Sequence, residues 1–211
     1  MVNYNAKVTK IYNILQHNQL TAAAVVVDTK KFNAFRLIDK LTNINNDIAL
    51  YIDQIREMLY QHPDHEFSLS YPGVADILAA RLIVMFGDNR DLFQTANEIQ
   101  TLAGCCPVTE KTAKKTKIVY FRRSCNKFHR DTLHNLAFSS LTKSDWALNY
   151  YQKHRNAGKK NAHALRCLAN LHIKILFAMW KNNSKYNENI FLAQKSRIVI
   201  ANEKNSIKNK K

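Results

Sequence analysis

A cluster of basic residues near the middle of the chain is the segment best suited to binding a polyanion. The basic side chains are Lys111, Lys114, Lys115, Lys117, Arg122, Arg123 and Lys127, and Arg130 follows shortly after. Tyr120, Phe121 and Phe128 are interleaved with them. Cations next to aromatic rings suit phosphate contact combined with stacking on bases or sugars. Alternatively, the rings belong to a core and the charges are merely solvated, and the two interpretations are compatible.

A second candidate is the turn Pro72-Gly73-Val74-Ala75, which separates two short apolar segments of helical pattern. Glycine permits a tight turn, and free amides at the start of the next helix can face a phosphate oxygen. We therefore predict a helix-hairpin-helix-like element in which Gly73 and Val74 contact DNA. Such elements usually carry a second glycine, but Ala75 stands at that position, and a plain helical hairpin is the alternative.

The remaining polar residues give little sign of a metal site or of nucleophilic catalysis. The four cysteines contain no C-x-x-C pair, and the histidines do not share a helix face at ligand spacing. We predict no metal in this chain, and we expect His172 to be a satisfied core residue. Ser124 lies in a basic setting between Arg123 and Cys125, but an ordinary loop hydroxyl is the simpler interpretation.

Apolar residues at heptad spacing predict a long helix in the N-terminal part of the chain. They are Leu37, Leu41, Ile44, Ile48, Tyr51, Ile55 and Met58. Steps that alternate between four and three residues are typical of a coiled-coil seam. We therefore expect residues 1–62 to form a helical, coiled-coil-like arm that joins copies of the chain into a homo-oligomer. The alternative is an amphipathic helix packed on its own domain.

The rest of the chain predicts a compact helical domain over residues 68–182. The whole sequence contains only 4 Gly and 3 Pro, so a mainly α fold is favoured. Helical patterns cover 91–103, 128–142, 146–154 and 161–181, and residues 118–121 favour a short extended stretch. Pro63 ends the preceding helix and marks the boundary. Residues 183–211 are expected to be a basic, flexible tail.

The charge is divided unevenly along the chain. Residues 1–100 contain 9 Lys and Arg against 11 Asp and Glu, whereas residues 101–211 contain 23 against 5. A net charge of +18 in one half favours a polyanionic partner, and we expect that partner to be nucleic acid, because each neutralised phosphate adds affinity through counterion release. A Lys-rich surface inherited from an AT-rich genome is the alternative. No apolar run reaches about 18 residues, so we expect no membrane span and a cytoplasmic protein.

Several short motifs stand in a characteristic order. They are Leu69-Ser-Tyr-Pro-Gly-Val-Ala-Asp-Ile-Leu-Ala-Ala80, Phe86-Gly-Asp88, Phe93, Leu102-Ala-Gly104 and Pro107, then Arg123, Arg130, Leu133, Tyr151, Gly158-Lys159, Ala162 and the helix Ile173–Trp180. In order and spacing they resemble the C-terminal domain of Piv-type, DEDD bacterial insertion-sequence transposases. The resemblance covers about residues 68–182, and the heptad helix stands where that family has a coiled-coil arm.

The resemblance implies DNA strand exchange by two partnered parts. One is an N-terminal RuvC-like domain whose four carboxylates hold Mg²⁺, and the other is a C-terminal domain with a nucleophilic serine. Related elements are guided by a structured RNA, which is therefore a further expected partner. Residues 1–35 are too few for the RuvC-like domain. We accordingly expect either a truncated transposase or one half of a split enzyme whose RuvC-like partner is supplied in trans. In both cases the chain has no cofactor of its own, is not autonomously active, and is associated with the bacterial nucleoid.

Thr112 stands at the position of the family serine, five residues after Pro107, with Ala113 where a glycine is expected. Threonine keeps a hydroxyl, but its β-methyl crowds in-line attack on phosphorus, and any such hydroxyl needs activation. Thr112 is thus the catalytic candidate that the resemblance implies, and an ordinary loop residue is the alternative.

Together these patterns favour the DNA-binding, C-terminal part of an insertion-sequence transposase. Whether the chain is itself an enzyme is left open by the sequence. Two alternatives remain: a non-catalytic regulator that binds nucleic acid, and a coiled-coil interaction protein whose basic charge is incidental.

Overall fold

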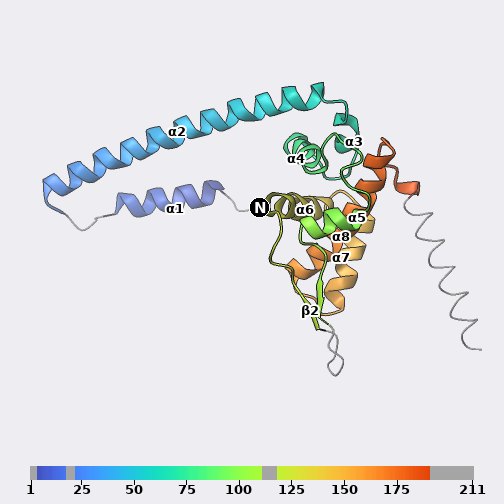
Figure 1. The fold of residues 1–211 in the computed structure, drawn as a ribbon. Helices are drawn as coiled ribbons and strands as arrows, with labels where there is room; N and C mark the ends of the chain where they lie inside the picture. Colours follow the sequence, from blue (N-terminus) through green and yellow to red (C-terminus); the bar gives the residue numbers. More distant parts are fainter. Residues whose placement is uncertain (1–3, 18–21, 111–117, 191–211) are drawn as a thin grey trace, which may run out of the picture. The chain divides into compact units, whose positions relative to one another are not determined.

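A computed structural model describes residues 4–17, 22–110 and 118–190, and it confirms a mainly α fold (Figure 1). The helices are α1 (Tyr4–Gln16), α2 (Ala24–Gln61), α3 (His65–Leu69), α4 (Asp76–Phe86), α5 (Ala96–Leu102), α6 (Lys127–Ser140), α7 (Asp145–Asn156) and α8 (Asn161–Lys181). The strands are β1 (Val108–Glu110) and β2 (Ile118–Tyr120), which confirms the extended stretch expected near residue 118.

The chain divides into two compact units, residues 1–51 and residues 52–211. The first contains α1 and most of α2, so the predicted helical arm is confirmed as helix. Its apolar side chains are exposed, as illustrated by Leu37 at 60%, Leu41 at 61% and Ile48 at 50%. Within this unit the heptad seam is therefore uncovered along the helix.

The last turns of α2 pack in the second unit. Leu59 is buried together with Ala79 and Ile83 of α4. Arg56 donates from Nε to Asp76 Oδ2 at 2.7 Å, which joins the same two helices. The unit boundary therefore lies inside α2, at residue 51, whereas the sequence suggested the loop near residue 62. Pro63 ends the helix, but the burial of Leu59 fixes the end of α2 to the second unit.

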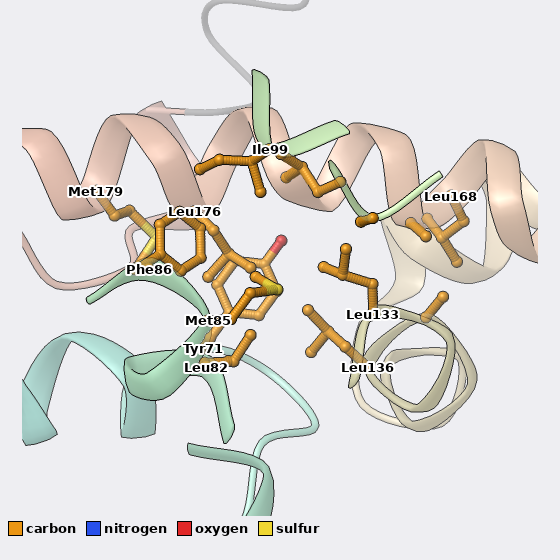
Figure 2. Packing of buried hydrophobic residues seen from close by; sticks show 14 of the residues in the cluster. Tyr71, Leu82, Met85, Phe86, Ile99, Leu133, Leu136, Leu168, Leu176 and Met179 are labelled. Atoms are coloured by element: carbon orange, nitrogen blue, oxygen red, sulfur yellow. The ribbon is translucent and has the colours of Figure 1, made fainter. Parts of the chain in front are cut away.

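The core of the second unit lies between α4, α5, α6 and α8 (Figure 2). Leu82 and Met85 of α4 lie on the side of Leu133 and Leu136 of α6, whereas Phe86 lies beside Met179. The helix α8 adds Leu168, Leu176 and Met179 to this group. Burial of one face of each helix is what the 3.6-residue periodicity of these segments requires.

A buried polar network joins three parts of this core. The hydroxyl of Tyr71 lies 2.6 Å from Nδ1 of His172, and Oγ of Ser140 lies 2.9 Å from Nε2. Ser140 donates its own proton to the carbonyl oxygen of Ala137 at 3.0 Å, so its oxygen must accept from Nε2–H of His172. Nδ1 then accepts the proton of Tyr71. Burial lowers the pKa of His172 to about 3, so the ring is neutral, and the expected satisfied core histidine is confirmed.

The first residues of the predicted tail pack on the second unit. Tyr186 accepts a hydrogen bond from Nε1 of Trp146 at 2.7 Å and lies against the ring of Tyr71. Lys185 pairs with Glu66 at 3.0 Å. Residues 191–211 lie outside the described residues, so the prediction of flexibility is not tested there. None of the helices in the described part of the chain is long and apolar enough to cross a membrane.

Candidate nucleic-acid interface

An open cavity of about 260 Å³ lies on one face of α6. Lys127, Arg130, Asp131 and His134 line it from successive turns of that helix, at the spacing i, i+3, i+4 and i+7. Arg166 reaches it from α8, and Phe121 reaches it from the residue after β2. We call these six residues the cationic pocket. Its volume is below the range of about 300–1,000 Å³ that is usual for small-molecule sites.

Phe121 orders the two guanidinium groups of the cationic pocket. Cζ of Arg130 lies 4.5 Å from the centroid of this ring, and Cζ of Arg166 lies 4.3 Å from it. Cation–π contacts at such distances favour the charged group and restrict its rotamers. Arg130 is held further, because its Nη2 donates to the backbone carbonyl of Arg122 at 2.5 Å. The two cations are therefore largely positioned before any ligand arrives.

The positive charge of the pocket is not neutralised by the residues that the structure describes. Its one carboxylate, Asp131, is already paired with Arg81 at 2.6 Å. Among the described side chains, none of the carboxylates lies within ion-pair distance of Lys127, Arg130 or Arg166. Three cations around one cavity repel one another unless an anion joins them, so this surface is suited to a phosphate group.

Residues from α5 to the start of α6 hold Arg130 in place. Gly104 has a positive φ of +67°, and a Cβ at this position would collide with the Arg130 guanidinium and with Cys125. Asn126 donates from its backbone N–H to the carbonyl of Leu102 at 2.8 Å. Its side chain also caps α6, accepting from the amides of Phe128 and His129. The glycine of the Leu102-Ala-Gly104 motif thus makes room for a cation of the pocket.

The nearby thiol of Cys105 does not offset this charge. Burial raises the pKa of Cys105 to about 12, so the thiol stays protonated at neutral pH. A buried, protonated thiol is also a poor nucleophile, since the thiolate is the reactive form. Cys105 is therefore a small packing residue.

The predicted basic loop connects the two strands of a short antiparallel pair. Val108 pairs with Tyr120, Thr109 with Val119 and Glu110 with Ile118. The candidates Lys111, Thr112, Lys114, Lys115 and Lys117 follow β1 in the sequence and lie outside the described residues. Their roles in DNA binding and catalysis stay predictions.

The other basic candidates fall within the described residues, but only some of them reach the pocket. Arg130 lines it and is half-buried, and Lys127 lines it and is exposed. Arg122 is half-buried and contributes its carbonyl to Arg130, while Arg123 is exposed. Ser124 is exposed as well, next to Arg123. DNA contact by each of these side chains remains a prediction.

The Pro72-Gly73 turn packs against the end of α6 and is not among the residues that line the cationic pocket. Gly73 has a φ of +82°, and a Cβ there would lie 2.9 Å from backbone atoms of Ser139 and Ser140 at the end of α6. Val74 is half-buried against the core. Close packing against α6 therefore explains why this turn contains glycine. The predicted contact of Gly73 and Val74 with DNA remains untested, and Asp76 adds a negative charge in the first turn of α4.

One group of polar residues has the composition of a metal site, namely His62, Asp64 and Asp88. Nδ1 of His62 accepts the backbone N–H of Asp64 at 3.0 Å, so its proton is on Nε2, which donates to Asp88. Asp64 is bound by Arg90 at 2.5 Å. Binding a cation through Nε2 would require the other tautomer of His62 and the loss of the Asp64 amide contact. We therefore describe this group as a structural joint between the end of α2 and the end of α4.

Residues 66–152 match the model of a transposase family, described as Transposase IS116/IS110/IS902. Over these residues the chain is therefore similar to the IS116/IS110/IS902 transposases. The matched range includes five of the six residues of the cationic pocket, and Arg166 lies beyond it. The predicted resemblance to the C-terminal part of an insertion-sequence transposase is thereby confirmed.

The relatives are proteins of insertion elements. The chain is 29% identical over 150 residues to an uncharacterized 43.6 kDa protein of IS110 from Streptomyces coelicolor, covering 71% of this chain and 37% of that protein. It is 26% identical over 170 residues to a mini-circle protein for IS117 from the same organism, covering 79% and 40%. It is 23% identical over 176 residues to a 42 kDa protein of IS900 from Mycobacterium paratuberculosis, covering 83% and 42%. The chain therefore spans about two fifths of the length of the curated relatives it matches.

Sequence reasoning missed Arg166 and the partnership of its guanidinium with Phe121. Arg166 is not part of a basic cluster, and the residues that recur at helical spacing in α8 are mostly apolar. An isolated charged residue in such a helix is usually assigned to the solvent face. The available signal was the position of Arg166 about one turn before the buried Ala169, on the border of the apolar face of α8. The chain separation of 36 and 45 residues from Arg130 and Phe121 left no local pattern to connect them.

Proposed function

We propose that this chain binds DNA as the C-terminal part of an insertion-sequence transposase, and that the cationic pocket holds backbone phosphates. The observation that carries the proposal is the ordered pair Arg130 and Arg166 on the ring of Phe121, which lacks a carboxylate partner among the described side chains. Guanidinium groups suit phosphate oxygens because their donors are arranged in a planar fork. The match of residues 66–152 to a transposase family supports DNA as the ligand.

Binding to duplex DNA across a range of salt concentrations tests this proposal. We expect the affinity to fall steeply between about 50 and 200 mM salt, as counterion release requires. Arg166→Gln should weaken binding on all sequences alike and reduce the slope of log K against log salt by about one. The matched control is Lys143→Gln, because Lys143 is an exposed cation beyond the opposite end of α6 from Lys127. Equal slopes for the two variants would remove Arg166 from the interface.

The chemical step is a separate proposal. We propose that strand exchange needs metal-binding carboxylates supplied from outside these residues, and that DNA binding by this part of the chain needs no metal. DNA affinity should then not rise when Mg²⁺ is added in place of a chelator, since Mg²⁺ acts only as a competing counterion. Thr112 is the proposed, weak nucleophile. Cleavage is therefore measured with a protein that supplies the carboxylates. Mg²⁺-dependent cleavage that survives in Thr112→Ala would then exclude Thr112, whereas DNA binding without any cleavage in that mixture would favour the non-catalytic regulator.

Two further partners complete the proposal. A structured RNA is proposed as a guide because related elements use one, and the cationic pocket would accept its phosphates as well. Competition between a folded RNA and duplex DNA for the chain, read out as displacement of labelled DNA, tests this. A second copy of the chain is the other proposed partner, joined through the arm formed by α2. Light scattering at several protein concentrations tests whether the chain self-associates.

A further inference from the structure

We propose that two copies of α2 pair in antiparallel orientation, in a register that places Leu41 of one copy opposite Ile44 of the other. This inference rests on the proposed self-association through the arm and specifies its geometry. It concerns residues 34–51, all of which lie within the first compact unit. The partner that covers the seam is thus a second copy of this chain. The sizes of the seam residues and the charges beside them support this orientation.

The seam has enough uncovered apolar surface to be an interface. Leu37, Leu41, Ile44, Ile48 and Tyr51 are each between 50% and 65% exposed in the single chain. They lie on one stripe of a continuous helix, because their spacing alternates between three and four residues. Exposed apolar patches of this kind are uncommon on proteins that remain monomeric.

Side-chain sizes fit the antiparallel register. Leu41 faces Ile44 of the second copy, and Leu37 faces its Ile48, so the central layers contain aliphatic pairs of similar volume. In the outer layer Ala34 faces Tyr51, which combines a small residue with a large one and keeps the layer thickness even. A parallel pair in register would instead put Tyr51 against Tyr51 and Ala34 against Ala34. It would contain one crowded layer and one underfilled layer.

The flanking charges distinguish the possible registers more sharply. Lys40 and Asp47 are the residues that precede Leu41 and Ile48 in the sequence, and both flank the seam on the same side. In the proposed antiparallel register Lys40 of each copy lies opposite Asp47 of the other, so the dimer contains this pair twice. Both side chains are exposed. Sliding one helix by a heptad in either direction would oppose Asp47 to Asp47 or Lys40 to Lys40. A parallel pair would oppose Lys40 to Asn45 and Asp47 to Ile52. Only the proposed register pairs opposite charges, and flanking charges are known to set orientation in coiled coils.

Disulfide trapping in the full chain tests the orientation. Leu37→Cys and Ile48→Cys are made as separate variants, one of them carrying a size tag, and mild oxidation is applied to each alone and to their mixture. The proposed register predicts a mixed crosslink and no self-crosslink, because two copies of position 37 would lie about 16 Å apart along the axis. The unsubstituted chain measures the background from the four native cysteines. Self-crosslinking of Leu37→Cys alone would show a parallel pair and overturn the proposal.

Charge exchange tests the register independently. Lys40→Glu should raise the dimer dissociation constant about tenfold, since two ion pairs become two like-charge pairs. Adding Asp47→Lys to the same chain should restore the original value. Asp39→Lys, on the outward face of the helix, is the matched control and should have little effect. Failure of the double variant to recover would overturn the register but not self-association. A chain that stays monomeric at all concentrations would overturn both, leaving the DNA-binding proposal intact.

Discussion

Replacing Gly73 by alanine should destabilise the second unit more than the same change at Gly158. The two glycines have nearly equal φ angles, +82° and +81°, so an alanine meets the same backbone cost at both. Their surroundings differ. A Cβ at Gly73 would lie 2.9 Å from backbone atoms of Ser139 and Ser140, whereas at Gly158 no atom lies within 4 Å. Gly158→Ala is therefore a matched control that isolates the close packing.

The expected magnitudes follow from these contacts. The left-handed conformation costs an alanine about 1–2 kcal/mol relative to glycine. The loss is partly offset by about 0.4–1 kcal/mol, because alanine restricts the unfolded chain. At Gly73 the backbone of α6 must also move, and overpacking of this kind costs about 1–3 kcal/mol. We therefore expect a loss of roughly 1 kcal/mol for Gly158→Ala and roughly 2–4 kcal/mol for Gly73→Ala.

Urea unfolding followed by tryptophan fluorescence measures both losses. The two tryptophans, Trp146 and Trp180, are buried in the second unit, so the signal reports that unit rather than the arm. Equal losses for the two variants would refute the packing explanation. If Gly73→Ala were as stable as Gly158→Ala but bound DNA more weakly, the glycine would be required at a phosphate contact, as its sequence context suggested. DNA affinity should therefore be measured on the same samples.

Three further predictions concern the buried network and the pocket. Because burial lowers the pKa of His172 from 6.5 to about 3, the unfolded chain binds this proton more readily. The contribution of His172 to the free energy of unfolding is complete above pH 6.5 and is lost as the pH falls toward 3, by about 1.4 kcal/mol per pH unit. In His172→Gln the free energy of unfolding, measured in urea, should therefore depend less steeply on pH. Tyr71→Phe leaves Nδ1 of His172 without a donor and should cost about 1–3 kcal/mol in urea unfolding. Gly104→Ala should displace Arg130 and weaken DNA binding with a reduced salt slope, measured by fluorescence anisotropy; an unchanged slope would show that Arg130 does not contact phosphate.

The helices could be predicted because their signals are local. Apolar residues at helical spacing marked α2 and α8, and Pro63 marked the end of α2. The low glycine and proline content excluded a turn-rich fold. The unit boundary could not be placed from these signals, because it depends on Leu59 finding Ala79 and Ile83 across the chain. A helix can continue through a domain boundary without any change in its own periodicity.

The candidate site was predicted in part for the same reason. Lys127 and Arg130 stood out as members of a basic cluster, and both line the pocket. The contribution of Arg166 depends on the packing of α8 against α6, which no short pattern encodes. The polar network of Tyr71, Ser140 and His172 also joins residues far apart in the chain, so a single sequence shows only that His172 lies on an apolar face.

Phe121 changes what the interface can recognise. Its position among basic residues suggested a platform on which a base stacks, but its ring contacts the guanidinium groups of Arg130 and Arg166. A ring used to order two cations has less surface left for a base. Phosphate contacts fix the position of a protein on DNA but carry no sequence information directly. Binding through the cationic pocket should therefore be insensitive to sequence, and any choice of target must come from other residues of the complex or from a paired nucleic acid.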